Sequence, residues 1–130
     1  MKLENQLVNK ELSIKLDKLG VKEESLYWHK IPNKRCRNGA VASIVEYPEK
    51  SKWFDYYRAY TVAELGEMLK KVETSEKLEY DSYLFYIPIW YGGKKKKWCT
   101  GGSLGLFIED KTEANARAKI KIYLVKHKLI

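Results

Sequence analysis

The stretch TEANARAKIKIYLVKH (residues 112–127) decides the fold, because its apolar side chains fall on two opposite sides of a predicted helix. Asp110 or Thr112 would cap this helix. A helix with two apolar sides packs between two layers. We expect one layer to be a sheet of the same domain, and the other to be the first helix or a second copy of the chain. The stripe predicted to meet a second copy consists of Ala116, Ile120, Tyr123, Leu124 and His127, and the opposite stripe of Ala118, Ile122, Val125 and Leu129.

Two further helices are predicted from the spacing of apolar residues and from signals at their ends. Residues 3–19 repeat leucine and valine at helical spacing, and Gly20 stands where a left-handed residue ends a helix. Thr61-Val-Ala-Glu64 is a capping box, in which each end side chain bonds the backbone amide of the other. Gly66 costs the second helix about 1 kcal/mol relative to alanine, which suggests that another backbone approaches there.

Short stretches rich in aromatic and β-branched residues predict strands. The turn signal Asn38-Gly39 joins the first two strands into a hairpin, and residues 33–37 form its basic tip. The predicted strands lie at residues 25–31, 41–47, 82–91, 98–100 and 104–109.

Strands grouped in meanders, with helices set apart from them, indicate the α+β class. We predict one domain over residues 1–130, with an antiparallel sheet of about four to five strands and about three helices mainly on one face. The length of 130 residues suffices for one hydrophobic core and is short for two.

The net charge of +8 is concentrated in three segments. Residues 30–37 and the tetralysine 94–97 each carry +4, and residues 111–130 carry +5. If these segments meet in space, they form a surface that attracts anions. If they point apart, the charge serves solubility. The candidate anion-binding residues are Lys34, Arg35, Arg37, Lys94, Lys95, Lys96, Lys97, Trp98, Arg117 and Lys121.

Aromatic side chains beside the basic segments allow two interpretations. Trp28, Trp90, Tyr91 and Trp98 could stack nucleobases while lysines and arginines bind phosphate. Alternatively, the aromatics pack the sheet and the lysines protect a hairpin from aggregation.

The glycine-flanked stretch YGGKKKKWCTGGS (residues 91–103) resembles a phosphate-binding loop only in composition. A P-loop requires G-x-x-x-x-G-K-[ST] between a strand and a helix. Gly93 and Gly101 bracket too many residues, and no helix is predicted to follow. This excludes a P-loop, while backbone nests at the glycine pairs remain possible.

The sequence also lacks the spacing of a metal or catalytic site. His29, Cys36, Cys99 and His127 occur in no C-x-x-C or H-x-x-x-H pattern, so we expect no metal and no cofactor. Cys36 lies between two arginines that would lower its thiol pKa, but no motif supplies a base or an oxyanion hole. We therefore expect a protein that is not an enzyme, with a Cys36-dependent enzyme as the remaining rival.

Three stretches resemble a group of short bacteriophage and prophage proteins from gut bacteria. They are residues 7–31, TVAELGEMLKK (61–71) and TEANARAKIKIYLVKHKLI (112–130). The resemblance covers about half of the chain and carries no catalytic residue. It implies a viral accessory protein that acts by binding, in a counter-defence role.

We therefore expect a non-enzymatic binding protein whose basic, aromatic surface engages a polyanion: nucleic acid, a nucleoprotein complex or a nucleotide signal. The alternative is a homodimeric interaction module that inhibits a host defence protein. The longest uncharged run, residues 82–93, is too short to span a bilayer. We expect no membrane contact and a location in the host cytoplasm.

Overall fold

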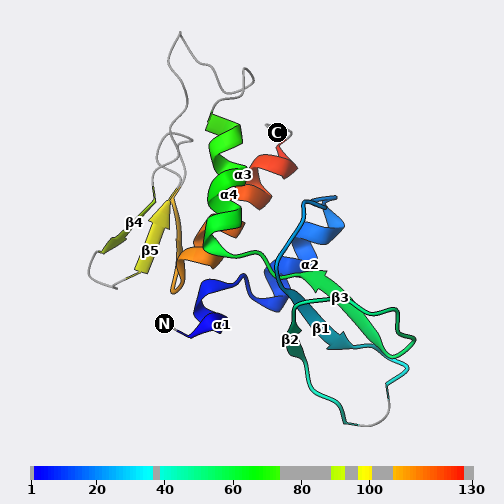
Figure 1. The fold of residues 1–130 in the computed structure, drawn as a ribbon. Helices are drawn as coiled ribbons and strands as arrows, with labels where there is room; N and C mark the ends of the chain where they lie inside the picture. Colours follow the sequence, from blue (N-terminus) through cyan, green and yellow to red (C-terminus); the bar gives the residue numbers. More distant parts are fainter. Residues whose placement is uncertain (1, 37–38, 74–88, 93–96, 101–106, 128–130) are drawn as a thin grey trace.

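The computed structural model describes residues 2–36, 39–73, 89–92, 97–100 and 107–127 (Figure 1). It has mixed helix and strand content, which confirms the α+β class. Its elements are α1 (Leu3–Gln6), α2 (Lys10–Lys18), β1 (Trp28–Pro32), β2 (Ser43–Val45), β3 (Phe54–Arg58), α3 (Val62–Glu73), β4 (Ile89–Gly92), β5 (Lys97–Thr100), β6 (Ile108–Asp110) and α4 (Glu113–Lys126).

The described strands form two antiparallel sheets of three strands each, in the orders β2-β1-β3 and β4-β5-β6. In Figure 1 the two sheets lie on different sides of the helices. Antiparallel pairing was predicted, but in one sheet. The predicted strand positions at residues 82–88 and 104–106 lie outside the described residues.

The predicted hairpin is confirmed as β1 paired with β2, and its short second strand has a physical reason. In the β1–β2 register Trp28 pairs with Val45 and Lys30 with Ser43. The next position of β1 on that side is Pro32, which has no N–H to donate. The ladder therefore ends at Ser43.

Strand β3 was not predicted. Its sequence, FDYYR, has three aromatic residues that favour strands, but it also has two charged residues and no flanking turn dipeptide to mark its ends. It pairs with β1 along its whole length, from Trp28 opposite Arg58 to Pro32 opposite Phe54. The pairing with β1 therefore sets the position and the ends of this strand, which the local sequence does not mark.

The predicted first helix is interrupted at residues 7–9, which corrects the expectation of one helix over residues 3–19. Leu7 forms an antiparallel bridge with Thr61, and the Val8 amide donates to the Tyr60 carbonyl at 3.0 Å. Asn9 then caps α2, because its side chain accepts from the Leu12 amide at 2.9 Å.

The end of α2 follows the prediction. Gly20 has φ +86°, its amide donates to the Asp17 carbonyl at 3.0 Å, and the Val21 amide donates to the Leu16 carbonyl at 3.0 Å. These two bonds define a Schellman motif. Val21 and Leu16 are both buried in the main core, so the motif also turns the chain back onto the helix.

Helix α3 begins with the predicted capping box. The Glu64 amide donates to the Thr61 hydroxyl at 3.2 Å, and the Thr61 amide donates to the Glu64 carboxylate at 2.9 Å. Gly66 was expected to allow the close approach of another backbone. It lies instead against the side chain of Arg117, since a Cβ at position 66 would lie 3.1 Å from the Arg117 Nη1 atom.

Helix α4 is capped by Thr112, whose hydroxyl accepts from the Asn115 amide at 3.2 Å. It lies between two layers, as its two apolar sides predicted. Ala118 and Ile122 belong to the core shared with α2 and α3, while the chain's own strands β5 and β6 also contact α4.

Candidate nucleic-acid interface

The basic tip predicted after β1 is partly described. The backbone turns there, since the Arg35 amide donates to the Asn33 side chain at 2.9 Å and the Cys36 amide donates to the Asn33 carbonyl at 3.0 Å. Lys34 and Arg35 are exposed on this turn. Arg37 lies outside the described residues.

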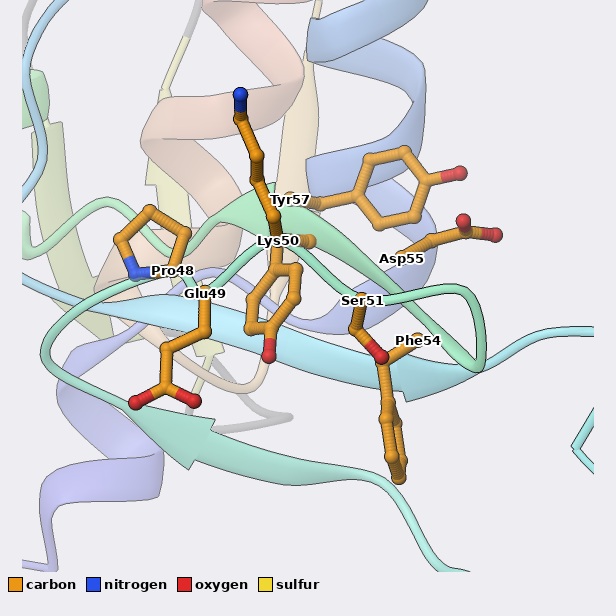
Figure 2. A pocket seen from close by; sticks show the side chains of 8 residues that line it. Pro48, Glu49, Lys50, Ser51, Phe54, Asp55 and Tyr57 are labelled. Atoms are coloured by element: carbon orange, nitrogen blue, oxygen red, sulfur yellow. The ribbon is translucent and has the colours of Figure 1, made fainter.

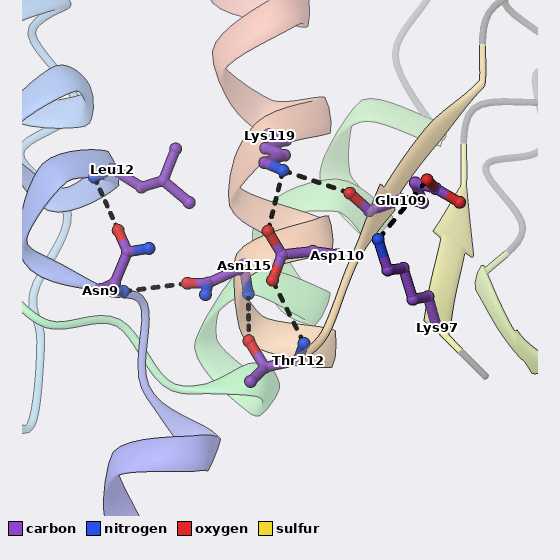
Figure 3. Close-up of polar contacts among 8 residues, drawn as sticks. All are labelled: Asn9, Leu12, Lys97, Glu109, Asp110, Thr112, Asn115 and Lys119. Carbon is purple, nitrogen blue, oxygen red and sulfur yellow. Dashed lines mark hydrogen bonds and ion pairs between the residues drawn. The ribbon is translucent and has the colours of Figure 1, made fainter. Parts of the chain in front are cut away.

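In the second basic segment, Lys94, Lys95 and Lys96 lie outside the described residues. Lys97 begins β5, and its ammonium lies 3.7 Å from the Glu109 carboxylate on β6 (Figure 3). Trp98 is half-buried, with its ring centre 5.4 Å from that of Tyr91. Both described residues are thus engaged with neighbouring strands of their own sheet.

The cations of α4 serve the fold. Arg117 binds the Glu113 carboxylate through Nε at 3.0 Å and Nη2 at 2.7 Å. The Lys121 side chain is 8% exposed, with its ammonium 3.9 Å from the Glu23 carboxylate. Because acidic partners lie beside these cations, α4 presents less free positive charge than its composition implies.

Lys119 joins the middle of α4 to the end of β6 (Figure 3). Its ammonium lies 2.8 Å from the Asp110 carboxylate and donates to the Glu109 carbonyl at 3.2 Å. Partial burial acts to raise the pKa of Asp110, but hydrogen bonds from Lys119 and the Thr112 backbone outweigh it and hold the pKa below its usual value.

The described parts of the three basic segments do not form one surface. Lys34 and Arg35 follow β1 in the first sheet, whereas Lys97 begins β5 in the second, and the two sheets lie apart in Figure 1. Lys97 and the β1 turn therefore do not belong to a single anion site.

The predicted dimer stripe on α4 also needs correction. Ala116, Ile120 and Leu124 are each 0% exposed within the single chain. Tyr123 is half-buried, and its ring centre lies 4.2 Å from that of the exposed His127. Because the chain itself covers Ala116, Ile120 and Leu124, a second copy could reach only the Tyr123 and His127 end of the stripe while the fold is intact.

A different basic and aromatic surface lies on the β2-β1-β3 sheet. Directly paired residues of antiparallel strands share one face, so the register places Trp28 with Arg58, Lys30 with Tyr56, and Pro32 with Phe54. We call this surface the aromatic face and define it by Trp28, Lys30, Phe54, Tyr56 and Arg58, all of which are half-buried.

Two cation–aromatic pairs organise the aromatic face. The Lys30 ammonium lies 4.4 Å from the centre of the Phe54 ring, and the Arg58 guanidinium lies 4.7 Å from the centre of the Trp28 ring. Each pair contributes about 0.5–1 kcal/mol at a partly exposed site. The pairs hold positive charge directly above aromatic rings.

The opposite face of this sheet is turned towards the helices. His29 is 7% exposed and donates through Nε2 to the Val8 carbonyl at 2.6 Å. Burial lowers the pKa of His29. Figure 2 shows Tyr57 beside α2 and Phe54 on the other side of β3. Most of the aromatic face therefore points away from the helix that packs on this sheet, whereas at its Arg58 end the guanidinium Nη1 atom lies 3.8 Å from the Asp17 carboxylate of α2.

The connection from β2 to β3, residues 46–53, runs past β1 because β1 lies between the two strands. We call it the crossover segment. A pocket of about 550 Å³ lies between Pro48–Ser51 and residues 54–57 (Figure 2). Two strongly exposed aromatics mark the ends of the crossover segment: Tyr47 is 77% exposed and Trp53 is 53% exposed.

Positive charge accompanies these aromatics. Residues 28–58 contain seven basic and three acidic residues, a net charge of +4. Lys50 and Lys52 stand on the exposed crossover segment, and Lys50 lines the pocket beside β3. Cations around accessible rings are the composition of a surface that stacks bases and neutralises phosphates.

Sequence reasoning missed most of this face because it missed β3. A signal was present: Phe54, Tyr56 and Arg58 alternate with Asp55 and Tyr57, which is the period of a strand. The weak turn signals around β3 concealed the pattern.

The described residues form no metal-binding cluster, and neither cysteine is in a disulfide. Cys36 is half-buried and Cys99 is buried, both as free thiols. Among the described residues, no three His, Cys, Asp or Glu side chains are grouped closely enough to hold a metal ion. Nor does the described part of the chain contain a helix with the length and apolarity to cross a membrane.

Comparisons with protein-family models, curated proteins and solved structures found no match.

Proposed function

We propose that the chain is a non-enzymatic binding protein whose aromatic face engages a polyanion. The observation that carries the proposal is the Lys30 ammonium above the Phe54 ring; the Arg58–Trp28 pair lies on the same sheet face, with the Arg58 charge partly neutralised by Asp17. Charged groups above rings can meet phosphates while neighbouring rings stack on bases. Of the possible polyanions, single-stranded nucleic acid fits best, since its bases are free to stack.

The exposed aromatic rings can stack on the free bases of a single strand, whereas the bases of a duplex are already stacked on each other. Tyr47 and Trp53 present ring surface to solvent at the two ends of the crossover segment. Stacking on such rings contributes about 1–3 kcal/mol per base and tolerates any sequence. We therefore propose binding that prefers single strands and has little sequence preference.

The resemblance to phage proteins supports a biological setting for this activity. We propose an accessory protein that acts in the host cytoplasm against a defence system that uses or senses nucleic acid. Nucleoprotein complexes and nucleotide signals share the same chemistry of phosphate and base, so they are alternative ligands of the aromatic face.

The test is fluorescence anisotropy with a labelled single-stranded 20-nucleotide oligothymidine and a matched duplex. We expect tighter binding of the single strand, with log Kd rising linearly with log salt at about 0.7 per neutralised phosphate. Lys30→Gln should lower this slope by about 0.7, whereas Lys126→Gln, at the exposed end of α4, should leave it unchanged.

A matched pair of aromatic variants tests stacking. Trp53→Ala should weaken binding by roughly 5- to 160-fold, which corresponds to the loss of one stacked base. Tyr91→Ala removes an equally exposed ring from the other sheet and should have no effect. Equal Kd values for wild type and Trp53→Ala would contradict stacking at the crossover segment. Binding that is unchanged by Lys30→Gln and lost only when Lys94–Lys97 are changed to serine would overturn the assignment to the aromatic face.

A further inference from the structure

The outer edge of β3 is open within the described part of the chain. In the order β2-β1-β3, this strand has β1 on one side and no described strand on the other. An edge strand exposes a row of backbone N–H and C=O groups that can pair with another chain. The question is which residues of β3 point outwards, and what partner they fit.

The hydrogen bonds at the two ends of the β1–β3 ladder answer the first part. The Ala59 amide donates to the Tyr27 carbonyl at 2.9 Å, and the Asn33 amide donates to the Trp53 carbonyl at 2.9 Å. Hydrogen-bonded pairs alternate along an antiparallel ladder. The backbone groups directed away from β1 are therefore those of Phe54, Tyr56 and Arg58.

These three outward positions are symmetric about Tyr56. If a second β3 lies antiparallel beside the first, with a two-fold axis at Tyr56, each outward residue meets an outward residue of the copy. Tyr56 of one copy lies opposite Tyr56 of the other. Phe54 of each copy lies opposite Arg58 of the other. Each such pair exchanges two N–H···O=C bonds, so three pairs supply about six. A register centred on Phe54 or Arg58 would pair fewer of them.

The side chains suit the same register. Phe54 of one copy would lie opposite Arg58 of the other, which repeats the cation–aromatic pairing already present in this sheet. Asp55 would lie opposite Tyr57, so no like charges meet directly across the strands. Directly opposed pairs of this kind stabilise antiparallel strands, whereas opposed like charges destabilise them.

Space beside β3 is also available. The pocket of about 550 Å³ between Pro48–Ser51 and residues 54–57 borders the strand along its length. The segment that lines its far side is exposed throughout and forms no described hydrogen-bonded ladder with β3. An incoming strand would enter between β3 and Pro48–Ser51, so this exposed part of the crossover segment must move aside, while no element of the core is displaced.

We propose that β3 pairs with β3 of a second copy of this chain, antiparallel and centred on Tyr56. The two three-stranded sheets then form one continuous sheet of six strands. This joins the two aromatic faces side by side, which doubles the length of the surface. The proposal concerns self-association and holds whether or not the aromatic face binds nucleic acid.

The first test measures the association state by sedimentation velocity over a range of protein concentrations. Wild type should show a dimer, and Tyr56→Ala should keep it, because alanine retains the outward N–H. Tyr56→Pro removes that N–H while leaving the bonds to β1, and proline is tolerated at such edge positions. Its dimer dissociation constant should be at least about tenfold higher than that of Tyr56→Ala.

A cross-link tests the register and stays informative if the proline variant fails to fold. In Tyr56→Cys combined with Cys36→Ser, the two thiols meet on the two-fold axis, where Cα atoms are about 5.5 Å apart and a disulfide can form. We expect a covalent dimer on mild oxidation. In Asp55→Cys the two thiols lie two residues, or about 7 Å, apart along the strands, so this variant should form no covalent dimer.

Salt separates this proposal from nucleic-acid binding. Each copy carries a net charge of +8, so screening should strengthen dimerisation while weakening attachment to a polyanion. A wild type that stays monomeric at all concentrations, or equal cross-linking of Tyr56→Cys and Asp55→Cys, overturns the proposal and leaves the function of the aromatic face unaffected.

Discussion

The His29 imidazole donates through Nε2 to the carbonyl of Val8, with 2.6 Å between nitrogen and oxygen. This bond joins the buried side of β1 to the break between α1 and α2. Val8 is 0% exposed and His29 is 7% exposed. The carbonyl that the interrupted helix leaves without an i+4 partner is therefore satisfied by a side chain of the sheet.

Acid should weaken the fold through His29. Burial is the largest influence and lowers the folded-state pKa below 6.5, assisted by Lys10 and opposed by the Val8 bond and Glu11. Above pH 6.5 both folded and unfolded states carry neutral imidazole. As pH falls below 6.5, the unfolded state binds the proton first, so stability declines by at most about 1.4 kcal/mol per pH unit for this group.

His29→Gln provides the comparison, because glutamine offers an amide donor in place of Nε2 but does not titrate. Urea unfolding of both proteins between pH 7.5 and 5 should show a smaller loss of stability in the variant. His127→Gln, an exposed histidine, is the control and should follow wild type. Identical pH profiles for wild type and His29→Gln would contradict the assignment.

Gly66 and Arg117 should be energetically coupled. Alanine in a helix interior is favoured over glycine by about 1 kcal/mol, but a Cβ at Gly66 would lie 3.1 Å from Arg117 Nη1. The guanidinium is held by Glu113 and must shift. Gly66→Ala should therefore gain less than the full amount in wild type and the full amount in an Arg117→Ala background. A double-mutant cycle measured by urea unfolding gives the difference, and strict additivity would contradict it.

Thr61 should stabilise the start of α3 through its hydroxyl. Thr61→Ala removes the acceptor for the Glu64 amide and should cost about 1 kcal/mol of unfolding free energy. Thr61→Ser keeps the hydroxyl and should cost a few tenths at most. If both variants lose equal stability in thermal or urea unfolding, the cost arises from the methyl group and not from the cap.

The sequence predicted the elements whose signals are local. Gly20 ends α2, Thr61 and Glu64 begin α3, and Thr112, one of the two predicted caps, begins α4, because each of these features depends on residues within one helical turn. The burial of α4 between layers was also foreseeable, since two apolar stripes require two coverings.

Features that depend on distant residues could not be read in this way. The break at residues 7–9 exists because Val8 and Leu7 pair with Tyr60 and Thr61, about fifty residues away. Likewise, β3 exists because β1 offers it an edge. The aromatic face could not be predicted for the same reason. Phe54 and Arg58 form part of it only because β3 pairs with β1, which brings them to Lys30 and Trp28.

Tyr60 should anchor the loop that follows α2. Its side chain is 1% exposed, and its hydroxyl donates to the Glu23 carbonyl at 2.9 Å, with the Val21 carbonyl at 3.4 Å. Burial raises the pKa of Tyr60 well above its usual range, so the hydroxyl is a protonated donor at neutral pH. Tyr60→Phe keeps the ring but leaves the carbonyls without this donor, which should cost about 1–3 kcal/mol.

Tyr57→Phe is the matched control for this change, because it also removes one hydroxyl but from a half-buried ring beside α2. It should change the free energy of unfolding by less than about 0.5 kcal/mol. Hydrogen exchange gives a second measurement: Tyr60→Phe should speed exchange of the Val21 amide, which closes the Schellman motif. Unchanged protection at Val21, together with equal stabilities of the two variants, would show that the hydroxyl does not hold this loop.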